Sequence, residues 1–251
     1  MIIAICNQKG GVAKTTTTIN LASCLAQCRK KVLVVDCDPQ YNLTVGVDIE
    51  PKGKDVYDLI LKEDVSAEEV IQKTNFAFDI IPASLKLANA EVEISNMFMR
   101  EELLKDKLEN IKNQYDYILI DCNPALGLLT LNALVSCDKV LVPIEPGAFN
   151  LEGIANLQNL IVKIKKKLNS SIDILGVLLT KVDERTKISK TFKQQLSNIF
   201  GDKFFNVVIH DNVKIQDAQM ESKPINFFDK HCTGYREYLK LAREVINRNE
   251  R

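Results

Sequence analysis

Short continuous apolar runs alternate with longer amphipathic stretches, and this alternation constrains the fold more than any other feature of the chain. The runs are rich in Ile, Val and Leu and have no polar face, so each is predicted to be a strand buried on both sides, as in a parallel sheet covered by helices. The predicted strands are Ile2–Cys6, Lys31–Asp36, Phe78–Ile81, Tyr117–Asp121, Lys139–Pro143, Ile172–Thr180 and Asn206–Ile209. The predicted helices are Lys14–Cys28, Ala90–Asn113, Leu128–Ser136, Leu151–Leu168, Ser189–Ile199 and Tyr235–Asn247. The pattern indicates an α/β fold with a doubly wound, mostly parallel β-sheet flanked by helices, whose ligands bind beyond the carboxyl ends of the strands.

The length of the chain and its charge limit the number of domains and the class of partner. With 251 residues, no repeats and no Gly/Ser/Pro-rich linker, residues 1–251 are expected to form a single domain. The 33 basic and 33 acidic side chains give a net charge of zero, which argues against a uniformly basic nucleic-acid-binding protein. Residues 1–125, however, carry 14 basic and 19 acidic side chains, whereas residues 126–251 carry 19 and 14. A basic face on the second half, and hence a DNA partner, remains open.

The cysteines and the N-terminus indicate a cytoplasmic protein. The seven cysteines are Cys6, Cys24, Cys28, Cys37, Cys122, Cys137 and Cys232. An odd number without a CxxC motif does not suit a disulfide framework, so reduced and mostly buried thiols are expected. The N-terminus lacks the basic start and apolar core of a signal peptide, and no stretch of about 18 apolar residues is present to span a membrane.

A glycine-containing loop lies between the first predicted strand and the first predicted helix. It reads Lys9-Gly10-Gly11-Val12-Ala13-Lys14-Thr15-Thr16. A strand–loop–helix unit of this kind turns backbone N–H groups and the positive end of a helix dipole toward one point, which is a phosphate site. Gly10 and Gly11 let the backbone approach a phosphate, Lys14 would reach the terminal phosphates, and the Thr15 hydroxyl would bind Mg²⁺.

Two further predicted strands end in aspartates at the same edge of the sheet. Asp36 and Asp38 follow the second strand, and Asp121 ends the strand Tyr117–Asp121. A single aspartate in such a place is often only a cap. Three of them beside a phosphate loop favour phosphoryl transfer, which needs a held Mg²⁺ and an aligned water.

The loop resembles the deviant Walker A loop, KGGxxKT, of the ParA/MinD family of ATPases. The strict pattern GxxxxGK[ST] is not met, because Gln8 and Ala13 occupy its glycine positions. The segments DCDPQYNLT and YDYILIDCNPALG are similar to two further ParA motifs, so the resemblance extends over nearly the whole chain, from Met1 to about Val245. It implies a P-loop NTPase-like fold that uses ATP and Mg²⁺.

The resemblance also assigns roles to individual residues. Lys9 would reach across a dimer interface to the partner's nucleotide, and Asp38 would lie near the attacking water. Asp36 would support the water shell of the metal, and Asp121 would be the Walker B carboxylate on Mg²⁺. Catalytic roles are thereby expected for Lys9, Lys14 and Asp38, and nucleotide contacts for Lys9, Gly10, Gly11, Val12, Ala13, Lys14, Thr15, Thr16 and Asn212. The metal-site residues are Thr15, Asp36 and Asp121.

The chain departs from the family pattern at four positions near the site. Ala13 and Tyr41 stand where relatives often have Gly, and Asn123 and His210 stand where they have Pro. At Ala13, a left-handed backbone would cost about 1 kcal/mol relative to Gly. His210 is either a changed contact to the base or a surface histidine.

DNA binding is expected from the same resemblance, because relatives bind DNA nonspecifically when they are ATP-bound dimers. Arg185 in DERT and Lys214 in NVKIQDA match positions of basic residues in relatives. Further lysines surround them or form a run at a helix end: Lys181, Lys187, Lys190 and Lys193, and Lys163, Lys165, Lys166 and Lys167. Such contacts to phosphates would depend on salt and not on sequence. The expected protein is a nucleoid-associated partitioning ATPase, a homodimer with ATP, whose slow hydrolysis is stimulated by a ParB-like centromere-binding protein.

Three alternatives remain open. A MinD-type ATPase would cycle on a membrane through a terminal amphipathic helix, but the stripe of Tyr235, Leu239, Ala242 and Ile246 is better explained by packing on the domain. An iron–sulfur carrier would need interface cysteines, for which Cys122 and Cys137 are the candidates. A GTPase would read guanine through Thr180-Lys181-Val182-Asp183, which mimics NKxD but begins with Thr.

Overall fold

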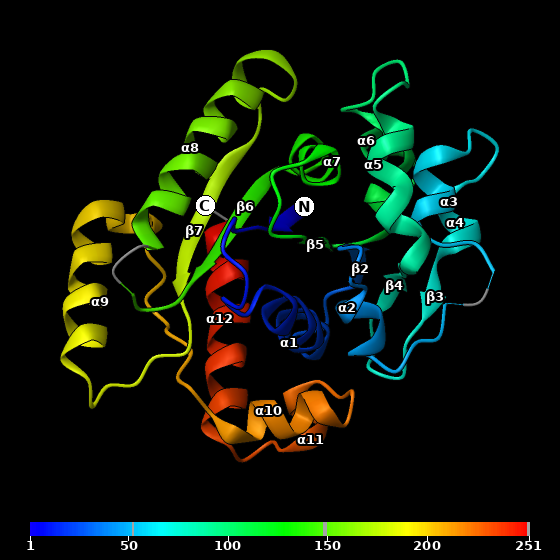
Figure 1. Cartoon of the computed structure of the whole chain (residues 1–251). Helices are drawn as coiled ribbons and strands as arrows, with labels where there is room; N and C mark the ends of the chain where they lie inside the picture. The colour runs from blue at the N-terminus through cyan, green and yellow to red at the C-terminus, as the bar shows by residue number, and fades with distance from the viewer. Residues whose placement is uncertain (52, 148–149, 250–251) are drawn as a thin grey trace.

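The computed structural model describes residues 1–51, 53–147 and 150–249. Its centre is a seven-stranded sheet in the order β3-β4-β2-β5-β1-β6-β7 (Figure 1). The strands are β1 (Ile2–Ile5), β2 (Val32–Cys37), β3 (Gln72–Lys73), β4 (Asp79–Ile81), β5 (Tyr117–Cys122), β6 (Lys139–Ile144) and β7 (Asp173–Leu179). Within the described residues, every strand pair is parallel except β3 with β4. The predicted mostly parallel sheet is confirmed.

The predicted strand Asn206–Ile209 is wrong. The segment runs beside β7 between two isolated bridges, at Phe204 and His210, and the N–H of Ile209 donates to the carbonyl of Leu179 at 2.9 Å. The N–H groups of Asn206 and Val207 donate instead to the carboxylate of Glu244, at 3.0 and 3.2 Å. A side chain of a distant helix thus takes the donors that a strand ladder would need.

Twelve α-helices and three 3-10 turns lie in the described part of the chain. The α-helices are α1 (Lys14–Gln27), α2 (Asn42–Val45), α3 (Val56–Leu61), α4 (Ala67–Val70), α5 (Ala90–Ile94), α6 (Leu103–Glu109), α7 (Leu128–Ser136), α8 (Asn150–Lys167), α9 (Lys187–Phe200), α10 (Val213–Met220), α11 (Ile225–Phe228) and α12 (Thr233–Asn249). The 3-10 turns are η1 (Leu85–Asn89), η2 (Lys112–Gln114) and η3 (Gly201–Lys203).

The single helix predicted over Ala90–Asn113 is also wrong, because it divides into α5, α6 and η2. Asn132 of α7 holds the break open. Its amide oxygen accepts from the N–H of Leu104 at 3.1 Å, and its amide nitrogen donates to the carbonyl of Arg100 at 2.7 Å. These tertiary hydrogen bonds replace bonds that a continuous helix would make.

Helices cover both faces of the sheet, and two apolar cores result (Figure 1). Along β1, Ile3 and Ile5 face the core made with α1, α10, α11 and α12, whereas Ala4 and the following Cys6 face the core made with α3 to α9. Alternate residues of one strand therefore enter different cores, which explains why the strands are apolar throughout. The doubly wound architecture is confirmed.

Helix α12 closes the chain against α1. Tyr238, Leu241 and Val245 are fully buried in the core, and the predicted stripe packs beside them, with Ala242 buried and Tyr235, Leu239 and Ile246 partly buried. The predicted packing of this helix on the domain is confirmed. In the described part of the chain, none of the helices combines the length and the apolar character needed to cross a membrane.

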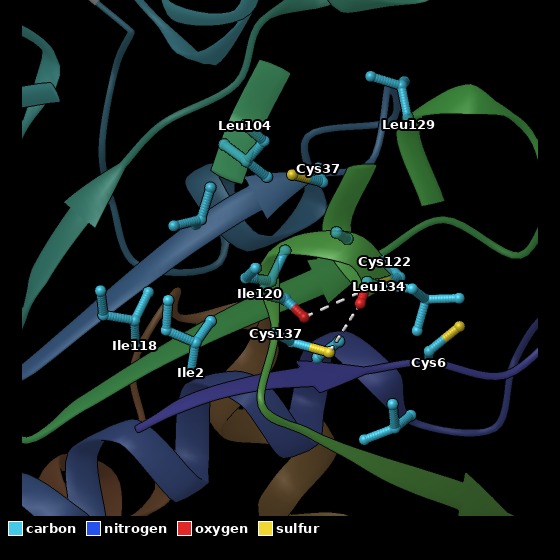
Figure 2. Packing of buried hydrophobic residues seen from close by; sticks show 14 of the residues in the cluster. Ile2, Cys6, Cys37, Leu104, Ile118, Ile120, Cys122, Leu129, Leu134 and Cys137 are labelled. Atoms are coloured by element: carbon cyan, nitrogen blue, oxygen red, sulfur yellow. Dashed lines mark hydrogen bonds between the residues drawn. The ribbon is translucent and has the colours of Figure 1, made fainter. Parts of the chain in front are cut away.

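The cysteines belong to these cores. All seven are free, and five are buried, with Cys28 and Cys232 partly exposed. Cys6, Cys37, Cys122 and Cys137 lie within one hydrophobic cluster (Figure 2). Burial, followed by the charge of Asp36, raises the pKa of the Cys37 thiol well above its usual value, as expected for an unreactive structural cysteine. The burial of Cys122 and Cys137 leaves neither free to hold a cluster at a surface.

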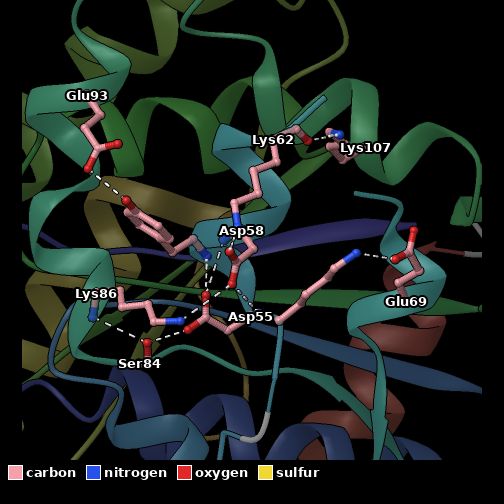
Figure 3. Close-up of polar contacts among 10 residues, drawn as sticks. Asp55, Asp58, Lys62, Glu69, Ser84, Lys86, Glu93 and Lys107 are labelled. Atoms are coloured by element: carbon pink, nitrogen blue, oxygen red, sulfur yellow. Dashed lines mark hydrogen bonds and ion pairs between the residues drawn. The ribbon is translucent and has the colours of Figure 1, made fainter. Parts of the chain in front are cut away.

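A capping box fixes the start of α3 near the end of β4. The Asp55 carboxylate accepts from the N–H groups of Tyr57 and Asp58, and the Asp58 carboxylate accepts from the N–H of Asp55 (Figure 3). Lys62 contacts Asp58 at 2.6 Å one turn later. The reciprocal bonds satisfy N–H groups at the helix start that have no partner within the helix.

Candidate nucleotide site

The carboxyl edge of the sheet brings the sequence-predicted residues together. Strand β5 lies between β1 and β2, and Asp121 is the register partner of both Ile5 and Asp36. The loop that follows β1 is therefore placed directly beside the acidic end of β5. Parallel pairing of residues that lie 116 and 85 positions apart in the chain assembles this edge.

The loop after β1 has the geometry of a phosphate cradle. Gly11 has φ +77°, and a Cβ added to Gly10 or Gly11 would meet no atom within 4 Å. Ala13 has φ 64° and ψ 35° and precedes the first residue of α1. Ala13 thus has the left-handed backbone that would cost an alanine about 1 kcal/mol relative to glycine. The loop opens on a cavity of about 530 Å³ whose lining includes Gly10, Gly11, Ala13, Lys14, Thr15, Thr16 and Asp38.

Asn7, which the sequence analysis did not single out, braces this loop. Its side-chain oxygen accepts from the N–H of Lys9 at 3.0 Å, and its amide nitrogen donates to the carbonyl of Pro143 at 2.7 Å. The ammonium group of Lys14 donates to the carbonyl of Lys9 at 3.1 Å. Lys14 is therefore folded back onto the loop, buried, and part of the lining of the cavity.

Asp121 joins the helix start to the sheet and suits a metal site. The Thr15 hydroxyl donates to one oxygen of its carboxylate at 2.7 Å, and the Thr18 hydroxyl donates to the other at 3.2 Å. Burial, and then the neighbouring Asp36 carboxylate, raise the pKa of Asp121 to about 8. A cation beside Asp121 would offset that cost, and hydroxyl and carboxylate oxygens are ligands that Mg²⁺ accepts.

Among the described residues, no three His, Cys, Asp or Glu side chains form a cage for a metal ion. Mg²⁺ usually has one or two protein ligands, and waters and substrate phosphates supply the rest. Thr15 and Asp121 next to the phosphate loop fit that arrangement.

Asp36 and Asp38 differ in their surroundings although they are two residues apart. Asp38 lines the cavity, and its carboxylate accepts from the N–H of Gln40 at 2.9 Å. Asp36 is fully buried, and one of its oxygens accepts from both the hydroxyl and the N–H of Thr44, at 2.7 and 2.9 Å. Burial, opposed in part by these bonds, raises the pKa of Asp36 to about 6. Asp38 thus faces the cavity, whereas Asp36 anchors the segment that carries Asp38.

Tyr41 and Asn123, two departures from the family pattern, shape the loops that follow β2 and β5. Tyr41 has φ 42°, in the left-handed region where glycine is preferred, and it precedes α2. The Asn123 amide oxygen accepts from the hydroxyl of Thr130 in α7 at 2.6 Å. The loop after β5 is therefore joined to α7 by a side-chain hydrogen bond that a proline at this position could not accept.

Lys9 contacts an acidic residue that follows the neighbouring strand β6. Its ammonium group contacts the carboxylate of Glu145, which follows β6, and both side chains are partly exposed. Strand β6 is the neighbour of β1 on the side away from β5. Glu145 was not singled out from the sequence, because only the pairing of β1 with β6 reveals its position.

A second, smaller cavity of about 50 Å³ continues the first toward the predicted base-contacting residue Asn212. The two share Ala13, Thr16, Lys181, Gln216 and Gln219 in their linings. The smaller one is also lined by His210 and Asn212. Asn212 has a structural role as well, since its side chain caps α10 by accepting from the N–H of Lys214 at 2.9 Å.

The guanine interpretation loses support at Asp183. Its carboxylate accepts from the guanidinium group of Arg185 at 2.9 and 2.8 Å, and these hydrogen bonds lower the pKa of Asp183 to about 2. An aspartate that reads guanine must instead accept from the N–H groups of the base.

The two predicted DNA contacts are exposed and do not line either cavity. Arg185 stands in the loop before α9 with its side chain 91% exposed, paired with Asp183. Lys214 stands in the first turn of α10, 3.4 Å from Asp217. Both side chains point charge to the surface, and each has an acidic neighbour of its own chain.

Comparison with known proteins gives consistent matches. The family described as "AAA domain" matches residues 1–174. Sporulation initiation inhibitor protein Soj of Bacillus subtilis is 45% identical over 247 residues, 97% of each chain. Chromosome partitioning protein ParA of Caulobacter vibrioides is 39% identical over 251 residues, 98% of this chain and 94% of its own. The solved structure of cobyrinic acid a,c-diamide synthase from Mycobacterium smegmatis, with bound ADP and magnesium, has a TM-score of 0.87 at 27% identity and covers 99% of this chain and 95% of that one.

Proposed function

The chain belongs to the ParA/Soj family of chromosome-partitioning P-loop ATPases, and we propose that it binds MgATP at the carboxyl edge of its sheet and hydrolyses it slowly to ADP and phosphate. The observation that carries the proposal is the contact of the Thr15 hydroxyl with the Asp121 carboxylate at 2.7 Å. It puts the two expected Mg²⁺ ligands together at the start of α1, beside a glycine loop open to a phosphate.

Several residues of the cavity have a task in this proposed reaction. Gly10, Gly11 and the N–H groups that open α1 would hold the β- and γ-phosphates, and the Lys14 ammonium group would leave the Lys9 carbonyl to contact them. Mg²⁺, when bound, would neutralise phosphate oxygens and keep them in place. The Asp38 carboxylate lines the same cavity and would orient the attacking water and accept its proton.

Dimerisation and DNA binding are part of the same proposal. Two subunits would face each other across their nucleotides, with Lys9 of each reaching the phosphates of the other. The dimer would present Arg185 and Lys214 twice, so DNA affinity would follow the nucleotide state. A ParB-like centromere-binding protein would stimulate hydrolysis and release the subunits. The protein would then reside in the cytoplasm, on the nucleoid.

The membrane-cycling alternative is less well supported, because α12 places its apolar residues in the core made with α1. A helix that enters a membrane surface needs a free apolar face.

Two substitutions test the nucleotide site. Lys14→Ala is expected to weaken ATP binding about 10- to 100-fold, as loss of a charged hydrogen-bond donor does. Asp38→Ala is expected to keep ATP binding but to slow hydrolysis by about 100-fold or more. Equilibrium binding of a fluorescent ATP analogue and phosphate release measure the two effects. Lys73→Ala, at the far edge of the sheet and 79% exposed, is the control. Hydrolysis by Asp38→Ala at the wild-type rate would refute the water-positioning role.

A further inference from the structure

Three charged side chains follow three neighbouring strands at the carboxyl edge of the sheet. Lys9 follows β1, Glu145 follows β6, and Lys181 follows β7, in the spatial order β1-β6-β7. An acidic side chain thus stands between two basic ones. The parallel pairing of the strands fixes this order, because each residue leaves the sheet close to its strand end.

Glu145 contacts both lysines, but unequally. One oxygen of its carboxylate contacts the Lys9 ammonium group directly, and the other lies 4.0 Å from the ammonium group of Lys181. Lys181 is itself held elsewhere, since it donates to the carbonyl of Gly11 at 2.6 Å. The firm partner of Glu145 among these two is therefore Lys9, with Lys181 as a second cation close by.

The contact is placed where it competes with a phosphate. Lys9 begins the glycine loop, and its own N–H and carbonyl are fixed by Asn7 and Lys14. Its side chain is 45% exposed, and its ammonium group contacts Glu145 of the same subunit. A lysine cannot pair closely with this carboxylate and extend to a phosphate in a facing subunit at once.

We propose that Glu145 is a latch that retains Lys9 in its own subunit, so that the triphosphate of the facing subunit must displace the carboxylate before the dimer closes. The inference rests on the proposed function, because it assumes the facing arrangement. Lys181 remains beside Glu145 and compensates its charge once Lys9 has left. The latch opposes dimerisation and makes closure depend on the stronger charge of a triphosphate.

The size of the effect follows from the exposure of the pair. Ion pairs that are this accessible change an equilibrium by about two- to fivefold. Both latches must open in a symmetric dimer, so the effect enters twice. Glu145→Gln is therefore expected to lower the dimer dissociation constant by about 4- to 25-fold.

Sedimentation velocity with a slowly hydrolysed ATP analogue tests the proposal. Glu145→Gln should dimerise at lower protein concentration than the wild type, and this gain should vanish when Lys9→Ala is present in both proteins being compared. Glu69→Gln removes a glutamate from an exposed pair with Lys54 far from the site and should have no effect. Equal or weaker dimerisation by Glu145→Gln would overturn the latch.

A second measurement separates this inference from the proposed function. In the nucleotide-free protein, reductive methylation followed by peptide mass spectrometry should label Lys9 faster in Glu145→Gln than in the wild type, with Lys30 as an internal reference. If no variant dimerises with the analogue, the proposed dimer fails. The labelling experiment then tests the Lys9–Glu145 contact by itself, and equal labelling of Lys9 in Glu145→Gln and in the wild type would refute that contact.

Discussion

Three residues around the nucleotide site adopt a backbone that favours glycine. Ala13, Tyr41 and Lys181 have φ of 64°, 42° and 51°. For a residue with a side chain, this region costs about 1–2 kcal/mol. Each is held there by its surroundings, for example by the hydrogen bond from the Tyr41 N–H to the Asp38 carbonyl at 2.8 Å. Strain of this kind is characteristic of sites whose loops are shaped for a ligand.

Ala13→Gly is expected to stabilise the protein. Relief of the left-handed strain exceeds the extra freedom that glycine gives the unfolded chain, so the free energy of unfolding should rise by about 0.5 kcal/mol. Urea unfolding measures the change. Ala26→Gly, within α1, is the matched control and should lower it by up to about 1 kcal/mol. A lower free energy of unfolding in both Ala13→Gly and Ala26→Gly would contradict the proposed strain at Ala13.

At the scale of elements, the loop that carries His210 is fastened to two helical regions by charge. The His210 ring contacts Glu237 of α12 at 2.5 Å and Glu184, before α9, at 3.2 Å. The His210 N–H also donates to Glu237 at 3.0 Å. The sequence left two interpretations of His210, a changed contact to the base or a surface histidine. The structure adds a third, because His210 joins its loop to Glu237 and Glu184 beside the smaller cavity.

The contacts of His210 with Glu237 and Glu184 predict a pH-dependent stability. Burial lowers the pKa of His210, but the hydrogen bonds and charges of the two glutamates outweigh it, and the net direction is upward from the usual 6.5. The stabilisation is therefore fully present below about pH 6.5 and is lost as the pH rises through the folded-state pKa. His210→Gln should lower the Tm more at about pH 6 than at about pH 9. A Tm difference that does not change with pH would contradict the assignment.

The same scale shows what the sequence could predict. Long apolar runs identified β1, β2, β5, β6 and β7 because burial on both faces leaves a strong signal. Pairing with distant side chains decided the failures: Glu244 took the donors of residues 206 and 207, and Asn132 interrupted the predicted helix over residues 90–113. Such contacts have no local pattern to reveal them.

The candidate site was predictable to the extent that it lies in one segment. The loop from Lys9 to Thr16 and the strand-final Asp121 came from motifs, and the structure brings them together. The structural roles of Asp36 and Asn212 were missed, because each depends on a cap or bond made by the side chain in the folded state. Glu145 needed the strand order.

On the scale of the whole molecule, the zero net charge hides two unlike halves. The half with more acidic residues holds Asp38 and Asp121 beside the phosphate cavity, whereas Arg185 and Lys214 belong to the more basic half. A dimer would double the basic surface without adding to the net charge. Nonspecific DNA affinity would then be conditional on assembly.

The expected DNA binding is salt-dependent, and it requires ATP. Retardation should appear with ATP and not with ADP, and the logarithm of the affinity should fall linearly with that of the salt concentration. Arg185→Ala or Lys214→Ala should reduce the slope by about 1.8, because each contact occurs twice in a dimer. Lys112→Ala is the control, because Lys112 lies in η2, just before the N-terminal end of β5 and therefore at the other edge of the sheet from the nucleotide site. Retardation without nucleotide, or flotation with liposomes instead, would contradict the proposal.

The order of the strands has a consequence for synthesis on the ribosome. Strand β1 is made first, but its register partners begin at Ile118 in β5 and Lys139 in β6. At about 5–20 residues per second, β1 waits about 6–23 seconds for its first neighbour. During that interval β2, β3 and β4 can pair with one another, but β1 has no neighbouring strand. The edge that holds Thr15 and Asp121 is therefore assembled only once β5 has been translated, about 100 residues after the loop from Lys9 to Thr16.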